Sequence, residues 1–250
     1  MNILINDFVA VGPEEMQELA LTDRIDTKFL APVSLLPPLL EAMKPLFRIQ
    51  SANGIRIARY ATQYFDTPER TFFLMHQNGK LNRQKIRIRS WLDSQRSFLE
   101  IKEKNNRGRT AKKRLPIPHK KISSTEDLGQ ARAFLECHSP LEAGRLAPVM
   151  ENDFHRMTFV NARHTERITL DTRIRFVNPQ TGKSGALDKL MVLEVKQERL
   201  CRSDFGALLL SLRIHPRSFS KYCIGTFLTN PEVKCNRFKT KMHIINKLIR

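Results

Sequence analysis

Residues 82–90 read NRQKIRIRS, and this stretch decides what kind of fold the chain can form. Arg83, Lys85, Arg87 and Arg89 occupy every second position, with isoleucines between the last three. Side chains of a β-strand point alternately to its two faces. The spacing therefore predicts a strand with one cationic face and one apolar face.

The same alternation returns in four other segments, each with Arg or Lys and a few carboxylates on one face. They are 23–29 (DRIDTKF), 98–104 (FLEIKEK), 166–176 (ERITLDTRIRF) and 192–198 (VLEVKQE). In the third of these, the charged face would hold Arg167, Thr169, Asp171, Arg173 and Arg175. A single strand of this kind would be an ordinary solvent-exposed face.

Several cationic faces together are a different matter, because like charges opposite one another on neighbouring strands destabilise a sheet. The pattern favours a sheet that closes on itself around an anion-filled channel. The apolar outer face of such a sheet would then be covered by helices.

Six segments carry helical signals that could supply this cover. They are 13–21, 34–44, 124–137, 203–214, 218–228 and 232–249. Pro37 and Pro38 suit only the opening turn of the second segment. Helices and strands are mixed without βαβ regularity, so we expect an α+β fold with an antiparallel sheet. We expect one domain over 1–250, with a core over about 20–228 and a basic C-terminal helix within 229–250.

The charge of the chain suggests a polyanionic partner. There are 43 Lys and Arg residues against 25 Asp and Glu in 250 residues, a net charge of +18. The balance is −3 in residues 1–50 and +11 in residues 83–121, where 14 basic residues face three acidic ones. Because the excess is interleaved with apolar residues, it belongs to strands and not to a basic tail.

Other classes of protein are excluded by simple features. No stretch approaches 18 uninterrupted apolar residues, so no transmembrane helix is expected, and the N-terminus is too acidic for a signal peptide. Cys137, Cys201, Cys223 and Cys235 lie far apart and form no C-x-x-C. They indicate thiols in a cytoplasmic protein, not a disulfide framework or a zinc site.

Eight short motifs follow one another along the chain. They are R-x-D-x-K (24–28), Y-x-T-x-Y-F-D-T (60–67), R-x-K-I-R-I-R (83–89), F-L-E-I-K (98–102), G-R-x-x-K-x-R (108–114), R-I-T-L-D-T (167–172), L-E-V-K (193–196) and S-K-Y (220–222). In this order they resemble the VTC domain, the catalytic polyphosphate polymerase domain of the vacuolar transporter chaperone family. That domain is part of the triphosphate tunnel metalloenzyme superfamily, and the chain is similar to its stand-alone, bacterial-type form.

The resemblance implies a closed antiparallel tunnel of about eight strands with a polar, cationic interior and flanking helices. It also implies binding of a nucleotide triphosphate or a polyphosphate chain together with Mn²⁺ or Mg²⁺. The polymerase branch transfers the γ-phosphate of ATP to a growing polyphosphate and releases ADP. We therefore expect ATP and polyphosphate as ligands, a cytoplasmic location, and a membrane protein as the further partner that the family suggests.

By position in the motifs, the resemblance implies three groups of site residues. The catalytic group is Arg87, Arg89, Lys102, Arg156, Arg167 and Lys196. The phosphate-binding group is Lys28, Arg83, Lys112 or its neighbour Arg109, Ser220 and Lys221. The metal ligand is Glu194. For Ser220 a plain helix cap is an equally good interpretation.

One departure from the family pattern distinguishes a polymerase from a hydrolase. The hydrolase branch begins with E-x-E-x-K, whereas this chain has Arg24 and Asp26 at the two acidic positions. The departure favours a polymerase over a tunnel-type tripolyphosphatase or nucleoside triphosphatase. A non-catalytic nucleic-acid binder is the third alternative. No nucleic acid is expected, because one Trp and three Tyr offer little for base stacking.

Overall fold

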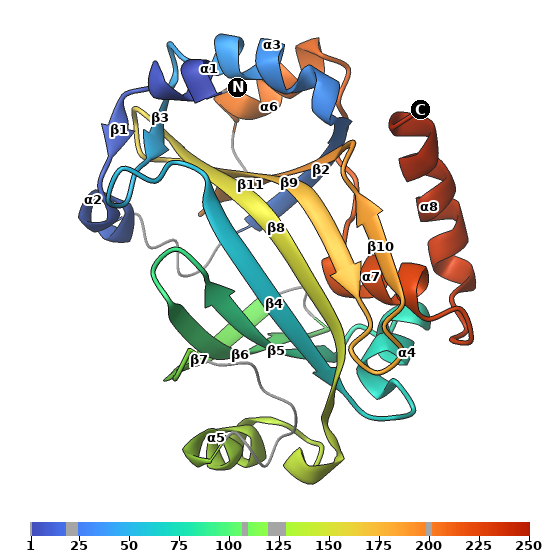
Figure 1. Ribbon diagram of the computed structural model, residues 1–250. Coiled ribbons are helices and arrows are strands. Elements are labelled where there is room, and N and C mark those ends of the chain that lie inside the picture. The colour runs from blue at the N-terminus through green and yellow to red at the C-terminus, as the bar shows by residue number, and fades with distance from the viewer. Residues whose placement is uncertain (1, 19–24, 107–109, 120–128, 199–201) are drawn as a thin grey trace.

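A computed structural model describes residues 2–18, 25–106, 110–119, 129–198 and 202–250 (Figure 1). Eight strands follow one another in a single antiparallel path, each hydrogen-bonded to the next. In order they are β2 (Ile25–Pro32), β11 (Leu190–Gln197), β9 (Arg167–Val177), β8 (Ala147–Asn161), β4 (Ala58–Asp66), β5 (Arg83–Trp91), β6 (Arg96–Lys104) and β7 (Thr110–Ile117). The predicted α+β fold with a large antiparallel sheet is confirmed.

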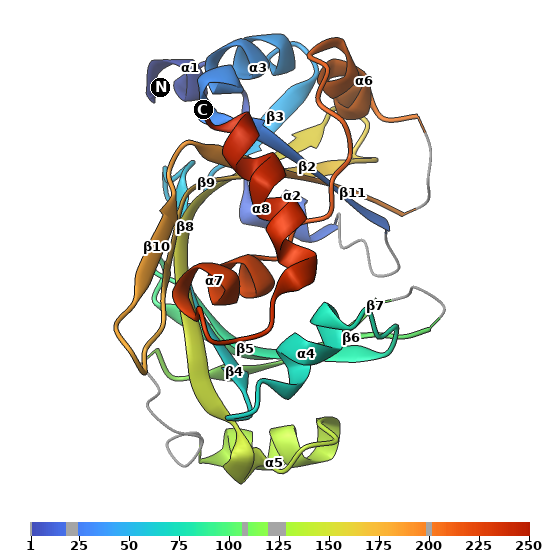
Figure 2. The same cartoon turned by 90° about the vertical axis from the view of Figure 1, so that its right-hand side faces the viewer.

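The sheet curves around a concave interior, so that β2 and β11 lie opposite β5 and β6 (Figure 2). Among the described residues, β2 and β7 at the two ends of the path do not pair with each other. The strands thus wrap the interior without forming a hydrogen-bonded ring. An ion pair bridges the opening instead, with Lys102 Nζ 3.9 Å from Asp26 Oδ2.

Three further strands extend the sheet at its margins. They are β1 (Ala10–Val11), which pairs with β3 (Phe47–Gln50), and β10 (Ser184–Leu187), which pairs with β9. β3 also pairs with β8. No helix among the described residues is long and apolar enough to cross a membrane.

Two groups of helices cover the outer face of the sheet, as the apolar positions of the strands predict. The helices are α1 (Asn2–Asn6), α3 (Leu36–Met43), α6 (Asp204–Ser211) and α5 (Gln130–His138). The first three pack on β2, β11, β9 and β8 through residues such as Leu39 and Phe205. α5 packs through Leu135 on the isoleucines of β5, Ile86 and Ile88, which are buried. The cations between those isoleucines therefore point to the interior.

Two other helices pack against the inner face, which the sequence did not lead us to expect. They are α7 (Lys221–Thr229) and α8 (Asn236–Leu248). Tyr222 and Phe238 lie in one buried cluster with Leu30, Val192 and Phe176 of the strands. At this end of the sheet the inward positions are apolar, so helices fill the interior and a polar space is left beyond them (Figure 2).

β9 departs from the predicted alternation in its second half. Arg173 has φ +50°, and the β8–β9 register shifts between Asp153 and His155. A bulge of this kind adds one residue and reverses which side chains face inward. Ile174 and Phe176 are therefore buried beside α7, whereas Arg173 and Arg175 are exposed. The prediction that Arg173 and Arg175 share the charged face with Asp171 is wrong.

Two helices remain, α2 (Pro13–Glu18), which lies within the segment predicted over 13–21, and α4 (Thr71–Gln77). Short 3-10 turns lie at Val33–Leu35 and Ala143–Arg145. α3 has Pro37 and Pro38 in its opening turn, as predicted. Much of the segment predicted as a helix over 124–137 lies outside the described residues, and α5 is its described part. α4 was not predicted at all.

Asp66 joins α4 to α7. Its buried carboxylate accepts hydrogen bonds from the backbone N–H groups of Thr67, Phe72 and Phe73 at 2.8 to 2.9 Å, and from the hydroxyl of Tyr222. Burial raises the pKa of Asp66, and these four hydrogen bonds oppose the rise. The Y-F-D-T and S-K-Y motifs thus meet in a structural joint that holds the first turn of α7.

Candidate functional site

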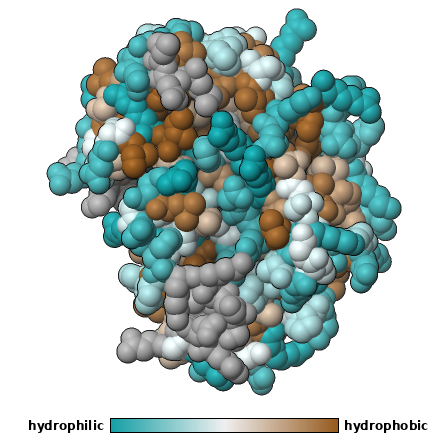
Figure 3. Space-filling model, viewed as in Figure 1, coloured by the Kyte–Doolittle hydropathy of each residue, from teal (hydrophilic) through white to brown (hydrophobic). Residues whose placement is uncertain are grey.

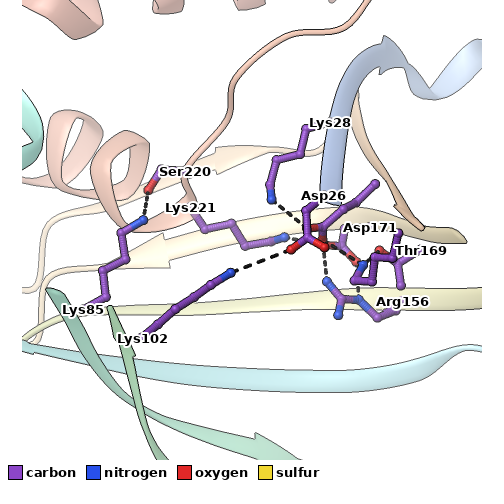
Figure 4. A network of polar contacts seen from close by, with 11 residues as sticks. Asp26, Lys28, Lys85, Lys102, Arg156, Thr169, Asp171, Ser220 and Lys221 are labelled. Carbon is purple, nitrogen blue, oxygen red and sulfur yellow. Dashed lines mark hydrogen bonds and ion pairs between the residues drawn. The ribbon is translucent and has the colours of Figure 1, made fainter. Parts of the chain in front are cut away.

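The polar part of the interior holds far more positive than negative side chains. Among the described residues, its network consists of nine cations and four carboxylates. The cations are Lys28, Lys85, Arg87, Arg89, Lys102, Lys112, Arg156, Lys196 and Lys221, and the carboxylates are Asp26, Glu100, Asp171 and Glu194. Figure 4 shows many of them converging from opposite walls. On the surface seen in the view of Figure 1, hydrophilic residues lie across the middle among hydrophobic ones (Figure 3).

Strand register builds the first cluster, around Glu194. Lys28 of β2 and Thr169 of β9 stand directly opposite Glu194 of β11. Lys28 Nζ lies 2.8 Å from one carboxylate oxygen, and Lys196 Nζ lies 3.0 Å from the other. Burial alone would raise the pKa of Glu194, but Lys196 and Lys28 hold it well below its usual value. Burial lowers the pKa of Lys196 to about 8, against the pull of Glu194.

A second cluster surrounds Asp171. Arg156 of β8 grips this carboxylate with two N–H groups, at 2.6 and 2.8 Å, and Lys221 of α7 pairs with it as well. Burial would raise the pKa of Asp171, yet the two cations hold it below its usual range. The stacked rings of Tyr60 and Phe154 lie beneath, with the Arg156 guanidinium carbon 5.3 and 5.2 Å from their centroids. This aromatic platform favours cations above it.

A third cluster lies on the opposite wall. Arg87 binds Glu100 of β6 at 2.6 Å, and Lys112 of β7 pairs with the same carboxylate. The next row across these strands is cationic throughout, since Lys85, Lys102 and Lys112 stand opposite one another. Burial lowers the pKa of Lys85 and of Lys102 to about 8. Such a row costs stability unless an anion lies against it.

Arg89 carries a buried hydrogen-bond donor that the described residues do not satisfy. Its Nε is buried and has no hydrogen-bond partner in the described part of the chain. Burial, together with the nearby charges of Arg87 and Arg156, lowers the pKa of Arg89 to about 10. A buried donor without a partner costs free energy unless a ligand satisfies it. A phosphate oxygen is the acceptor that suits a guanidinium.

A cavity of about 480 Å³ opens from this space at the start of β2 and β5 and the end of β6. Its charged lining consists of six cations, namely Lys28, Arg83, Lys85, Lys102, Lys104 and Arg217, and one carboxylate, Asp26. His76 of α4 and the segment 216–219 complete the wall. The volume and the charge of this cavity suit an anion with several negative groups.

The residues present fit a divalent metal only in company with phosphate. Glu194 and Asp26 lie on neighbouring strands one diagonal position apart, on the same face. The described residues contain no group of three or more His, Cys, Asp or Glu that could hold an ion. Mg²⁺ and Mn²⁺ accept one or two carboxylates when water and substrate phosphate supply the other oxygens. The donor set matches that mode and not an all-protein cage.

The structure brings most of the residues predicted for the site into this one space. They are Lys28, Arg87, Arg89, Lys102, Lys112, Arg156, Glu194, Lys196, Ser220 and Lys221. Ser220 has both of the roles considered for it. It caps α7 by accepting from the N–H of Cys223 at 3.3 Å, and it accepts from Lys85 Nζ at 3.1 Å.

The other predicted residues lie at the edge or cannot be placed. Arg83 stands at the cavity and donates to the carbonyl of Lys80 at 2.7 Å. Arg167 is the first residue of β9 and stands opposite Lys196 of β11. Arg109 lies outside the described residues, as does Arg24.

Sequence reasoning missed several groups that shape the site. Lys85 belongs to the alternating stretch and needed only the same argument as its neighbours. The Tyr60–Phe154 platform and the two counter-ions Glu100 and Asp171 depend on strand pairing, which no local signal reveals.

A curved antiparallel sheet around a cationic interior defines the class, a tunnel-fold protein. The chain belongs to the VTC domain family, whose model matches residues 23–230. No curated protein matches the chain.

Solved structures of similar shape are distant in sequence. A candidate adenylate cyclase from Bacillus halodurans is 15% identical, with a TM-score of 0.48 over 79% of this chain and 95% of that one. A candidate adenylyl cyclase from Hippeastrum, described as having a dominant triphosphatase activity, is 14% identical, with a TM-score of 0.46 over 80% and 94%. The PH1819 protein of Pyrococcus horikoshii is 13% identical, with a TM-score of 0.43 over 80% and 98%. Similarity at this level carries no inference about activity.

Proposed function

We propose that the chain is a polyphosphate polymerase, which transfers the γ-phosphate of ATP to the end of a polyphosphate chain and releases ADP. One observation carries the proposal. Among the described residues, the interior keeps a row of three lysines, its nine cations outnumber its four carboxylates, and the buried Nε of Arg89 has no hydrogen-bond partner. Membership of the VTC domain family supports the same substrate class.

The arginines and the lysines of the interior would have different roles in phosphate binding. Arg87, Arg89 and Arg156 would hold non-bridging oxygens with planar forks, while Lys102 and Lys196 would place point charges beside the transferred group. The bond between the γ-phosphorus and its bridging oxygen breaks, and a terminal oxygen of the acceptor chain forms the new bond. Such a transfer needs positioning and charge cancellation far more than covalent help from the protein.

The scarcity of unengaged carboxylates supports transfer to phosphate over transfer to water. A water nucleophile must lose a proton, and an enzyme usually supplies a base for it. Three interior carboxylates, Glu100, Asp171 and Glu194, are each held by two cations. A terminal phosphate has a second pKa of about 6, so its attacking oxygen is already ionised near pH 7.

Glu194 is the proposed ligand for Mn²⁺ or Mg²⁺, with Asp26 beside it. An ion bound there with phosphate would neutralise charge on the phosphoryl oxygens. Two lysines of the first cluster would then turn from Glu194 toward phosphate, since both now pair with that carboxylate.

The test is incubation of the purified protein with ATP and Mn²⁺ or Mg²⁺, followed by separation of the products. Long polyphosphate with an equal release of ADP is the expected result. Free phosphate without polyphosphate would mean a tunnel hydrolase. An Arg87→Ala variant should lose activity, whereas Arg132→Ala, on the exposed face of α5, should keep it.

A further inference from the structure

The cationic lining does not stop at the cavity but continues onto the neighbouring helix α8. Lys241 Nζ of α8 donates to the hydroxyl of Ser218 at 2.9 Å, and Ser218 lines the cavity. α8 contacts β2, α4 and α7, and so it spans the opening between the two walls of the sheet. The helix therefore stands directly beside the mouth of the interior.

A second contact fixes the same side of α8. The guanidinium of Arg237 lies against Gly79, where an added Cβ would be 2.1 Å from its Nη1. Gly79 follows α4, which carries His76 into the cavity wall. Arg237 and Lys241 are one helical turn apart, so they form one line along the flank of α8 that faces the mouth.

His76 lies close enough to Lys241 and to the cavity cations Lys85 and Arg83 to be affected by all three charges. Its Nε2 is buried and has no hydrogen-bond partner among the described residues. Burial lowers the pKa of His76 to about 2, and Lys85, Arg83 and Lys241 act in the same direction. The imidazole is thus neutral, and its free Nε2 can take part in one hydrogen bond with a phosphate.

We propose that the cavity mouth and the α8 flank, defined by Arg237 and Lys241, bind the part of a polyphosphate chain that lies outside the tunnel. Affinity would then keep rising with chain length after the interior is filled. The 13-residue helix is about 20 Å long, which gives an extended chain several further contacts. The inference rests on the proposed function for its substrate class.

A chain fits this surface better than a membrane does. An interfacial helix inserts an apolar face into the lipid. α8 already buries Phe238, Met242 and Ile245 in the core, and this fully described helix exposes no large apolar side chain. Two of its cations, Arg237 and Lys241, also continue the lining of the cavity through their contacts with Gly79 and Ser218.

The test compares binding of tripolyphosphate with binding of a chain of about 60 phosphates, by calorimetry without ATP. The unmodified protein should bind the long chain more tightly per molecule. An Arg237→Gln/Lys241→Gln variant should bind the long chain about fivefold more weakly, since each exposed ion pair contributes roughly a factor of two to three. Its affinity for tripolyphosphate should stay within about twofold, which also shows that the interior is folded.

The control and the salt dependence sharpen the test. Arg132→Gln/Arg145→Gln removes two exposed cations around α5, on the far side of the molecule from α8, and should change neither affinity. The slope of log affinity against log salt for the long chain should fall by about 0.7 for each lost contact, as for single-stranded polyphosphodiesters.

Several results would overturn the inference. One is an equal loss of affinity for both ligands in the flank variant, and another is no gain of affinity with chain length. A variant that loses binding to phosphatidylserine vesicles but not to polyphosphate would assign α8 to a membrane instead. If the length-dependent binding and its loss are found but ATP yields no polyphosphate, the inference stands and the polymerase proposal fails.

Discussion

At the α7 end of the interior, Arg156 and Lys221 share the carboxylate of Asp171, whereas on the opposite wall Lys85 and Lys102 face each other across neighbouring strands. In the first region the protein supplies its own anion, so the cations are held in place before any ligand binds. In the second region Lys102 has one long ion pair, 3.9 Å from Asp26, and Lys85 donates to the hydroxyl of Ser220, so a ligand would supply most of the negative charge. The first region should therefore contribute to stability and the second to binding.

The largest effect should follow the loss of the internal anion. Asp171→Asn keeps the shape of the side chain but leaves Arg156 and Lys221 buried without their counter-ion, and should lower the free energy of unfolding by about 3–5 kcal/mol. Urea unfolding measures it. Glu41→Gln, which breaks an exposed pair with Lys44, should stay within about 0.5 kcal/mol of the unmodified protein. A loss no larger than this control for Asp171→Asn would refute the division into two regions.

A substitution of Glu194, which belongs to neither region, tests the proposed metal site. Glu194→Gln should lower polymer synthesis by about 100-fold, or ~2.7 kcal/mol, because the proposed metal ligand is lost. The fold should persist, because Lys196, whose pKa is near 8, can release its proton once the carboxylate is gone. Turnover with Mn²⁺ and Mg²⁺ and the circular dichroism spectrum are the measurements. Turnover that survives the change would remove Glu194 from the proposed metal site.

A substitution of Arg89 should change the free energy of unfolding in the opposite direction to the substitution of Asp171. Arg89→Met removes a buried Nε that has no partner among the described residues, together with its repulsion by Arg87 and Arg156. The free energy of unfolding of the ligand-free protein should therefore rise by about 1 kcal/mol. Tripolyphosphate should bind about tenfold more weakly, because one guanidinium contact is gone. Thermal unfolding with and without tripolyphosphate measures both. A variant that is less stable without ligand would show that Arg89 has a structural role.

The smallest effect should come from pH. The pKa values of Lys85 and Lys102 are about 8 in the folded state against 10.5 for a free lysine, because burial disfavours the charge. Between pH 8 and 9 the unfolded chain therefore binds more protons than the folded one, and the free energy of unfolding should rise with pH. Affinity for tripolyphosphate should fall over the same interval as positive charge is lost.

A matched variant identifies the groups responsible for this dependence. Lys85→Met should show a smaller rise in stability and a weaker loss of affinity between pH 8 and 9. An unchanged profile would mean that other groups titrate there.

Local periodicity explains what could be predicted from the sequence. The inward cations of β5 and the outward Ile86 and Ile88 follow from period two alone, and the structure confirms both. Along β9 the same rule failed at Arg173, because a bulge depends on the partner strand and not on the strand's own residues. Pairings such as Arg156 with Asp171 depend on register, which the sequence does not reveal.

The features that the sequence did not predict depend on packing between distant parts of the chain. The helical pattern of 218–228 was recognised, but no local feature shows that α7 enters the concave side of the sheet. That placement depends on apolar inward residues such as Leu30 and Val192, which come from different strands. The joint between Asp66 and Tyr222 is equally remote from local rules.

That joint has a consequence for how the protein forms. Asp66 and Tyr222 are 156 residues apart, so the contact closes only after most of the chain has been synthesised. Until then Lys221 cannot reach Asp171, and two walls of like charge lack the helix that separates them. Contacts so distant in sequence slow folding, because the entropy of a long loop is lost before they form. A nascent chain that ends before α7 would carry all the strands of the sheet around an open, repulsive interior.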